Sequence, residues 1–422
     1  MKITELKTKI AEGALSALGL YSDAEAAKER YYAAIDSFKA LYGDEREVYL
    51  LSVSGRSELL GNHTDHNNGR VLAGAIDRDI IAVVAKRDDG VVSLKSEGYD
   101  ADVVDVKNCR DPKKFPDFSS ASLIAGVANG FEARGYKVGG FDAYTTSDVL
   151  KGSGISSSAA YEVMIGNIFN HLYNGGEVEN TTVAKVAQYA ENVYFGKPSG
   201  LMDQMACAVG GFVYIDFENK NEPKIEPISL SLKDHGYELC IVNTGGNHAD
   251  LNDDYASVPR EMRAVAAILG REVLAGVSEC ELISKAKEIR AEAGDRALLR
   301  AIHFVRENKR VDCGRDALAG GDIDAFFKAV RASGHSSFEY LQNVYTNKNA
   351  REQGLSLALA LTDGFCDGVG AYRVHGGGFA GTIQAYVRCE CADEYASLMN
   401  SVFGEGAVMR LNVRSAGAIR LF

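Results

Sequence analysis

KGSGISSSAA, residues 151–160, lies between a β-rich, turn-rich segment and a run of good helix formers, AAYEVMIGNIFNHLY. Glycines let a backbone approach a ligand closely, and serines supply hydroxyls and favour the start of a helix. A helix start also presents unpaired N–H groups and a partial positive charge. The stretch therefore predicts a phosphate cradle, although it is not a Walker A loop, because no Gly-Lys-Ser/Thr ends it. Taken alone, it equally fits a plain loop that caps a buried helix.

Three other stretches decide between these interpretations. They are GRSELLGNHTDHN at 55–67, GKPSGLMDQ at 196–204 and GGGFAG at 376–381. In this order and spacing, from about Val53 to Thr382, the set resembles the galactokinase branch of the GHMP small-molecule kinases. The resemblance implies an α+β fold of two domains, with the active site in the cleft between them.

Composition bounds the possibilities further. A chain of 422 residues is long for one core, so two domains are expected. The net charge of −12 argues against nucleic acid or an anionic membrane as a partner. The N-terminus is amphipathic and carries acidic residues, unlike a signal peptide, and the eight cysteines are scattered. We therefore expect a cytoplasmic protein with reduced thiols, among them buried Cys207, Cys240 and Cys366.

Hydrophobic periodicity predicts helices over residues 3–42, 119–135, 156–173 and 181–195. Strands are predicted at 48–53, 210–217 and 237–242, with a β-rich segment at 371–387. The runs 80–86 and 91–95 around Asp88-Asp89-Gly90 are typical of a hairpin. The charged stretch 218–224 predicts a boundary between a domain 1–217 and a domain 218–422. The glycine spacing at 376–381 matches a dinucleotide fingerprint, but a strand rather than a helix should follow, which favours a glycine-rich hairpin.

Phosphoryl transfer needs positioning and charge neutralisation. By resemblance, Asp203 is the catalytic aspartate facing the anomeric hydroxyl of a sugar, and Arg56 is its partner. Ser158 and Glu191 would hold Mg²⁺, since oxygen ligands suit this ion. An isolated glutamate is otherwise usually a solvated charge on a helix, and an Asp can simply cap one. The nucleotide phosphates would be bound by the cradle residues Gly152, Ser153, Gly154, Ile155, Ser156, Ser157, Ser158 and Ala159.

The same resemblance assigns a set of sugar-binding residues, namely Asn62, His63, Asp65, Tyr255 and Gly377. Without the flanking motifs the segment 62–65 would be an ordinary turn, and Tyr255 an aromatic at a helix start. Galactokinases usually have glutamate at the position of Asn62, asparagine at Glu58 and tyrosine at His66. Galacturonate kinases lack the acidic residue and have histidine at His66. An asparagine amide could donate to a carboxylate that a glutamate would repel.

The predicted function is an ATP- and Mg²⁺-dependent sugar 1-kinase that converts galactose to galactose 1-phosphate. The partners expected are the sugar and MgATP, with no nucleic acid and no membrane, and the chain is expected to be a monomer. One alternative is a kinase for galacturonate or another galactose-like sugar. Galactose is favoured because Arg56, His63, Asp65 and Tyr255 are all in place, and because no lysine or arginine other than Arg56 lies near Asn62, Arg70 being the next. Another alternative is a silent sugar sensor, which the intact serine loop disfavours.

Overall fold

The computed structural model describes residues 1–149, 154–197, 199–219, 222–246 and 251–422. Contacts divide the chain into two compact units that are each discontinuous in sequence. The first comprises Met1–Arg56, Ala75–Gly211 and Arg414–Phe422, and the second comprises Ser57–Gly74 and Phe212–Val413. The predicted boundary between residues 217 and 218 stays a prediction.

The N-terminal region of the first unit is helical, as predicted for residues 3–42, but it is divided into three helices. It forms α1 (Ile3–Ala11), α2 (Ala14–Ala17) and α3 (Ala24–Tyr42). Gly13 (φ 86°) and Gly19 (φ 62°) adopt left-handed conformations that interrupt helical geometry. The Asp23 side chain then caps α3 by accepting from the N–H of Ala26 at 2.9 Å.

The sheet of the first unit has the strand order β12-β1-β2-β5-β3-β4. Its strands are β1 (Tyr49–Leu60), β2 (Arg70–Lys86), β3 (Val91–Ser96), β4 (Ala101–Asp105), β5 (Phe141–Ser147) and β12 (Ala418–Arg420). The predicted hairpin around Asp88-Asp89-Gly90 is wrong, because β5 lies between β2 and β3. β5 is antiparallel to β2 and parallel to β3.

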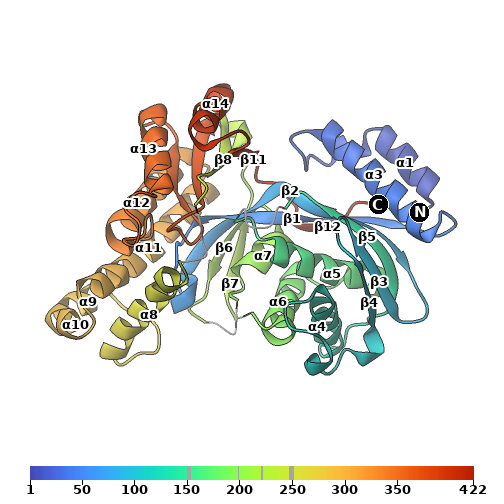
Figure 1. Ribbon diagram of the computed structural model, residues 1–422, viewed down its shortest axis with the longest axis horizontal. Coiled ribbons are helices and arrows are strands. Elements are labelled where there is room, and N and C mark those ends of the chain that lie inside the picture. Colours follow the sequence, from blue (N-terminus) through green and yellow to red (C-terminus); the bar gives the residue numbers. More distant parts are fainter. Residues whose placement is uncertain (150–153, 198, 220–221, 247–250) are drawn as a thin grey trace. The chain divides into compact units, whose positions relative to one another are not determined.

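Helices cover both faces of this sheet. Ile81 and Val83 of β2 pack with Tyr31, Ile35 and Phe38 of α3 in one core. The other face carries α4 (Ser120–Glu132), α5 (Ser157–Tyr173), α6 (Asn180–Ala190) and α7 (Met202–Val209). Figure 1 shows these four helices on the opposite side of the strands from α1 and α3. The predictions of helices near 119–135, 156–173 and 181–195 are thus confirmed, with a π-helical turn, η4 (Glu191–Phe195), extending α6.

The second unit contains a four-stranded sheet of order β11-β8-β10-β9. Its strands are β8 (Tyr237–Asn243), β9 (Ala371–His375), β10 (Thr382–Arg388) and β11 (Val408–Leu411). β9 and β10 pair with His375 opposite Thr382, which confirms the glycine hairpin and excludes the dinucleotide-binding interpretation. β6 (Phe212–Asp216) separately pairs with residues 70–74 of β2 and with β7 (Lys224–Ile228).

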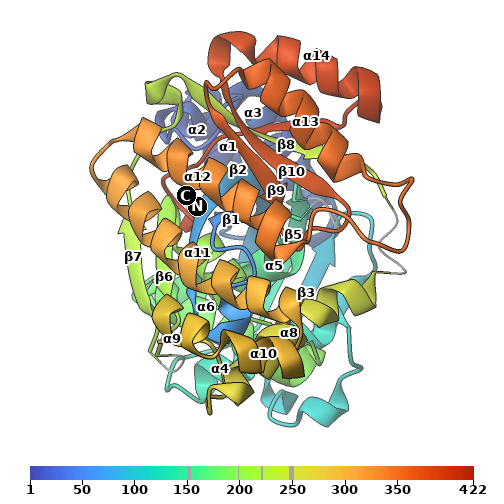
Figure 2. The same cartoon turned by 90° about the vertical axis from the view of Figure 1, so that its left-hand side faces the viewer.

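The helices of the second unit pack on both faces of the four-stranded sheet. Ile383 and Ala385 share a core with α13 and α14, whereas Tyr386 packs against Phe327 of α12 in a tilted arrangement with ring centroids 5.3 Å apart. Figure 2 shows α11 alongside α12. The helices are α8 (Asn252–Ile268), α9 (Glu279–Ser284), α10 (Ala286–Glu292), α11 (Asp295–Ala319), α12 (Ile323–Ser336), α13 (Gly354–Cys366) and α14 (Ala392–Phe403).

Short helical turns complete the two units. They are η1 (Asp65–Asn67), η2 (Val106–Asn108), η3 (Pro112–Lys114), η5 (Lys233–His235), η6 (Ser337–Leu341) and η7 (Cys389–Cys391). Two of these turns matter for the site: η1 begins at Asp65, the last residue of the predicted sugar segment, and η6 contacts that segment through Ser337.

Candidate active site

The serine-rich loop leads into α5 of the first unit, and Gly152 and Ser153 lie outside the described residues. Ile155 is fully buried and its carbonyl accepts from the N–H of Arg56 at 3.2 Å. Ser156 occupies the cap position of α5 in a left-handed conformation (φ 63°). A serine at this position is expected to cap the helix with its hydroxyl. Instead, the Ser156 hydroxyl donates to Asp203 Oδ2 at 2.6 Å. The loop is thereby tied to the predicted catalytic aspartate.

Arg56 and Asp203 form the ion pair that sequence analysis predicts. Arg56 Nε donates to Asp203 Oδ1 at 2.7 Å, and its Nη1 donates to the Gly154 carbonyl at 2.5 Å. Burial alone would raise the pKa of Asp203, but Arg56 and the Ser156 hydroxyl outweigh it and hold that pKa below its ordinary value. The carboxylate is therefore ionised at neutral pH and can accept a hydrogen bond from a hydroxyl.

Glu191 lies on η4 and is only 2% exposed, which is unusual for a glutamate. Its Oε1 accepts from Ser158 Oγ at 3.3 Å and from Lys197 Nζ at 2.7 Å. Its Oε2 accepts from Gln204 Nε2 at 2.8 Å. The structure thus brings together Ser158 and Glu191, the predicted metal ligands.

Sequence reasoning missed three residues behind this carboxylate: Lys197, Gln204 and Glu162. Gln204 Nε2 donates to Glu162 Oε2 at 3.1 Å as well as to Glu191. Burial, and then repulsion by Glu191, raise the pKa of Glu162 well above its ordinary value. The spacing of Glu162 four residues after Ser158 on one helix is a signal that could have found it.

The oxygens of Ser158 and Glu191 suit a magnesium ion, but Lys197 competes with the ion for Glu191. A hydroxyl oxygen and a carboxylate oxygen are the hard ligands that Mg²⁺ prefers, and a metal bound through few protein ligands takes the rest from water and phosphate. The ammonium of Lys197 already compensates the charge of Glu191 within the protein. An ion bound here would therefore share Glu191 with Lys197 or replace its contact.

The predicted sugar segment belongs to the second unit and begins where β1 ends. Gly61 takes a φ of 101°, where an added Cβ would meet the Arg70 carbonyl at 2.6 Å. Thr64 Oγ1 then closes the turn by hydrogen bonding to the carbonyls of Gly61 (2.8 Å) and Arg70 (2.6 Å). His63 also has a positive φ, 58°, which is uncommon for a residue with a Cβ. The segment is a tightly built turn.

Three successive carbonyls of the glycine hairpin are held by predicted sugar-binding residues. Asn62 Nδ2 donates to the Gly376 carbonyl at 2.7 Å. His63 Nε2 lies 2.8 Å from the Gly377 carbonyl, and the Tyr255 hydroxyl donates to the Gly378 carbonyl at 2.8 Å. The structure therefore brings Asn62, His63, Tyr255 and Gly377 together.

The partner of His63 fixes its tautomer. A carbonyl only accepts, so Nε2 carries the proton and Nδ1 is an acceptor. Burial, and then the neighbouring His66, lower the pKa of His63 to about 3, so the ring is neutral. Within the described part of the chain, Nδ1 is buried and has no hydrogen-bond partner. It is suited to accept from a ligand hydroxyl.

Asp65 lies on η1 and its Oδ1 accepts from the N–H of His66 at 3.0 Å. The Asp65 side chain is 23% exposed, whereas Asn62 is 1% exposed. Asp65 therefore retains contact with solvent, and Asn62 does not. The roles of these residues in binding a sugar stay predictions.

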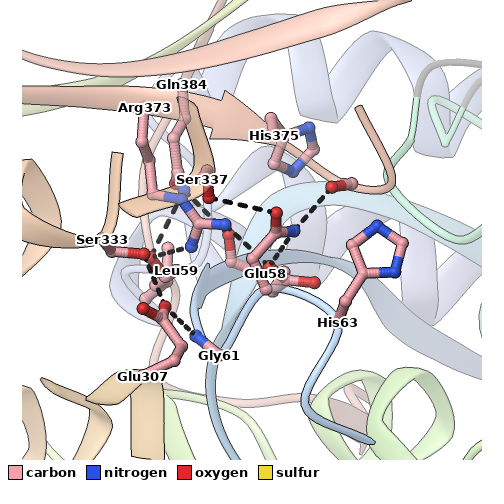
Figure 3. A network of polar contacts seen from close by, with 12 residues as sticks. Glu58, Leu59, Gly61, His63, Glu307, Ser333, Ser337, Arg373, His375 and Gln384 are labelled. Carbon is pink, nitrogen blue, oxygen red and sulfur yellow. Dashed lines mark hydrogen bonds and ion pairs between the residues drawn. The ribbon is translucent and has the colours of Figure 1, made fainter. Parts of the chain in front are cut away.

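A buried polar network lies behind the segment (Figure 3). Arg373 is 0% exposed and donates to Glu58 Oε1 at 3.1 Å and to the Leu59 carbonyl at 2.9 Å. Gln384 Nε2 donates to the Glu58 carbonyl at 3.1 Å. Figure 3 also shows Glu307 meeting Ser333 and the N–H of Gly61. Sequence reasoning missed these partners, because they come from strands and helices distant in the chain.

Comparisons with known proteins identify the relatives of this chain. Residues 120–211 match the GHMP kinases N terminal domain, and residues 36–86 match the galactokinase galactose-binding signature. A galactokinase of Streptomyces coelicolor is 31% identical over 393 residues, which cover 92% of this chain and 97% of that protein. A galactokinase of Lactobacillus helveticus is 30% identical over 358 residues, covering 83% of this chain and 88% of that protein.

Solved structures show the same fold. The structure of Lactococcus lactis galactokinase complexed with galactose aligns with a TM-score of 0.76 and 22% identity, covering 91% of this chain and 98% of that one. A mevalonate kinase aligns with a TM-score of 0.59 and 17% identity, covering 87% of this chain and 99% of that one.

The fold and the matched N-terminal domain place the chain in the class of GHMP kinases, an α+β class of small-molecule phosphotransferases. Because the Streptomyces coelicolor relative exceeds 30% identity over nearly its whole length, the chain belongs to the galactokinase family. It is a phosphotransferase with an alcohol group as acceptor, and ATP use follows from the family.

Proposed function

We propose that the chain is an ATP-dependent galactose 1-kinase, which transfers the γ-phosphoryl group of ATP to the anomeric hydroxyl of galactose. The observation that carries this proposal is the Arg56–Asp203–Ser156 arrangement at the start of α5. It joins an ionised carboxylate, a guanidinium and a glycine- and serine-rich helix start. These are the parts that phosphoryl transfer requires.

Each residue has a defined task in this mechanism. Asp203 accepts the hydrogen bond of the attacking hydroxyl and orients its oxygen. Arg56 keeps Asp203 ionised and can stabilise negative charge that develops on the transferring group. The N-terminus of α5, with residues 152–159, binds the nucleotide phosphates. Mg²⁺, held by Ser158 and Glu191, would neutralise phosphate charge.

His63, Asp65, Tyr255 and the glycine hairpin hold the sugar in this proposal. Nδ1 of His63, which has no hydrogen-bond partner among the described residues, suits a facing sugar hydroxyl better than a facing carboxylate, because a carboxylate has no proton to donate at neutral pH. Galactose is also the sugar named for the solved Lactococcus lactis relative. This favours galactose over galacturonate as substrate.

The remaining expectations are also proposals: a monomer, located in the cytoplasm, with no nucleic acid as partner. The net charge of −12 supports the last, since it opposes a polyanion. All eight cysteines are free thiols, which suits a reducing compartment, and Cys207, Cys240 and Cys366 are buried as predicted. Over the part of the chain that the structure covers, no helix has the length and apolarity to cross a membrane.

The test is ADP release with a panel of galactose, N-acetylgalactosamine, galacturonate, glucuronate and arabinose. We expect the largest kcat/KM with galactose and phosphate on C1 of the product by NMR. A preference for galacturonate would contradict galactose as the substrate but would still support the kinase activity. No ATP consumption with any sugar would support the silent sensor instead.

A further inference from the structure

The side chain of Asn62 is fully occupied within the protein. Nδ2 donates to Glu58 Oε1 at 3.1 Å and to the Gly376 carbonyl at 2.7 Å. Oδ1 accepts from Asn343 Nδ2 at 2.7 Å and from Ser337 Oγ at 3.3 Å. A primary amide has two donor protons and two acceptor lone pairs, so its capacity is used up.

The orientation of this amide follows from its partners. A carboxylate and a carbonyl face Nδ2, and both only accept, whereas an amide NH₂ and a hydroxyl face Oδ1, and both can donate. Turning the amide over would put oxygen against Glu58 and Gly376. Buried polar groups without partners are costly, so this 1% exposed side chain is held in one state.

The partners of Asn62 are themselves anchored. Arg373 holds Glu58, and Asn343 Nδ2 also donates to the Gly377 carbonyl at 3.1 Å. The Asn343 carbonyl accepts from the N–H of Phe379 at 2.5 Å. Asn62 therefore joins three structures: the end of β1, the glycine hairpin and the segment after η6.

We propose that Asn62 is a positioning residue, which fixes the glycine hairpin and Glu58 so that His63 and Gly377 are correctly placed, and that it does not read the sugar. The inference rests on the proposed galactose kinase function. It replaces the expectation that the amide of Asn62 contacts the sugar. For the same reason, Asn62→Glu should lower activity, because it puts a second carboxylate beside Glu58.

The decisive variant is Asn62→Asp, which keeps the shape but replaces two donors by acceptors. We expect kcat/KM for galactose to fall about tenfold or more, mainly through the KM for sugar. The same factor should be lost with 6-deoxygalactose, which lacks the C6 hydroxyl, so that the ratio of the two kcat/KM values stays within about twofold of wild type. Direct reading of C6 by Asn62 predicts the opposite: the ratio collapses toward one. That result, or unchanged kinetics, would overturn the proposal.

A second variant separates positioning from general damage. In Asn62→Asp/Glu58→Gln, the glutamine amide can donate to the new carboxylate, so the repulsion between positions 58 and 62 is removed. We expect the double variant to regain part of both the kcat/KM and the melting temperature that Asn62→Asp loses. Additive losses in this cycle would contradict the contact on which the proposal depends. If Asn62→Asp does not fold, Asn343→Asp carries the same kinetic test, because it removes the donor to Asn62 and Gly377.

Asn67→Asp is the matched control, since Asn67 is equally buried but lies two residues beyond the segment 62–65 and bonds to Met262 and Leu274 instead. Its kcat/KM should stay near wild type. ADP affinity, measured by calorimetry, should be unchanged in all variants. Failure of the proposed function would appear in the wild type, as no ADP release with galactose. The stability cycle between positions 58 and 62 would then still decide the positioning role, with additivity overturning it.

Discussion

Arg56 and Asp203 are 147 positions apart in the chain, yet Nε of one lies 2.7 Å from Oδ1 of the other. The pair forms because β1 carries Arg56 within the first unit, while α7 of the same unit presents Asp203 in its first turn. Ser156, between them in sequence, completes the arrangement by donating to the second carboxylate oxygen. The two carboxylate oxygens of Asp203 thus connect the Arg56 guanidinium with the serine-rich loop at the start of α5.

Asp203→Asn and Arg56→Ala should each reduce kcat by about a hundredfold or more, because each removes a charge at the reacting group. Nucleotide binding should persist, since neither residue is proposed to contact the adenine. Single-turnover transfer and ADP calorimetry measure the two effects. Exposed Asp88→Asn and Arg110→Ala are the controls, and near-normal turnover in either active-site variant would remove the proposed mechanism.

Ser158→Ala and Glu191→Gln should raise the Mg²⁺ concentration needed for half-maximal activity, because each removes or neutralises an oxygen ligand. Glu191→Gln should have the larger effect, since it also removes the partner of Lys197. The measurement is an activity titration with Mg²⁺ at saturating sugar. Glu177→Gln, an exposed change in the same unit, should leave the titration unchanged. Identical curves for all three variants and wild type would place the metal elsewhere.

Two glycines of the hairpin, Gly376 and Gly378, should distinguish the cost of backbone strain from the cost of a steric clash with a neighbouring residue. An added Cβ at Gly378 would meet the Asn343 carbonyl at 2.0 Å with φ at 83°, whereas Gly376, at φ 69°, has nothing within 4 Å. We expect Gly376→Ala to cost about 1 kcal/mol through backbone strain alone and Gly378→Ala considerably more. Urea unfolding measures both. Equal losses would show that the space at Gly378 does not constrain the hairpin.

Acid should destabilise the second unit through His303. Burial, opposed only in part by Glu307, lowers the pKa of His303 from 6.5 to about 4. The unfolded chain therefore binds a proton that the folded one does not, so this stability is complete above pH 6.5 and is lost as the pH falls toward 4. The loss amounts to about 3 kcal/mol. Urea unfolding of wild type and His303→Gln between pH 7.5 and 4.5 tests it: the variant should show the shallower slope.

Local signals in the sequence were sufficient for the motif residues and most elements. Glycine and serine spacing located the start of α5, and periodicity located α4 and α6. The misplaced hairpin shows the limit: Asp88-Asp89-Gly90 is a good turn, but strand pairing is non-local, and β5 was inserted from fifty residues further on. The two units could not be predicted from local sequence patterns for the same reason, because each is formed from segments that are distant in the chain.

The candidate site shows this limit at single residues. Glu58 and Asn62 each depart from the usual galactokinase residues, and the sequence presents them as two separate changes. The structure shows that they are hydrogen-bonded partners, with Arg373 adding a third member from 315 positions away. A sequence motif gives the residue types at its positions. Whether the Asn62 amide has any hydrogen-bonding capacity left for a ligand depends on partners that are brought to it only by the fold.

β1 carries Arg56 and ends at Leu60, just before the predicted sugar segment, which begins at Asn62. Side chains alternate along a strand, so inserting or deleting one residue between these positions would turn every following side chain to the opposite face. If the segment 62–65 binds the sugar as proposed, a graft that exchanges it must therefore keep the number of residues between Arg56 and Asn62. Substitutions in this region keep the alternation of side chains along β1. An insertion or deletion after Arg56 would instead change the orientation of the segment relative to the strand residue that contacts Asp203.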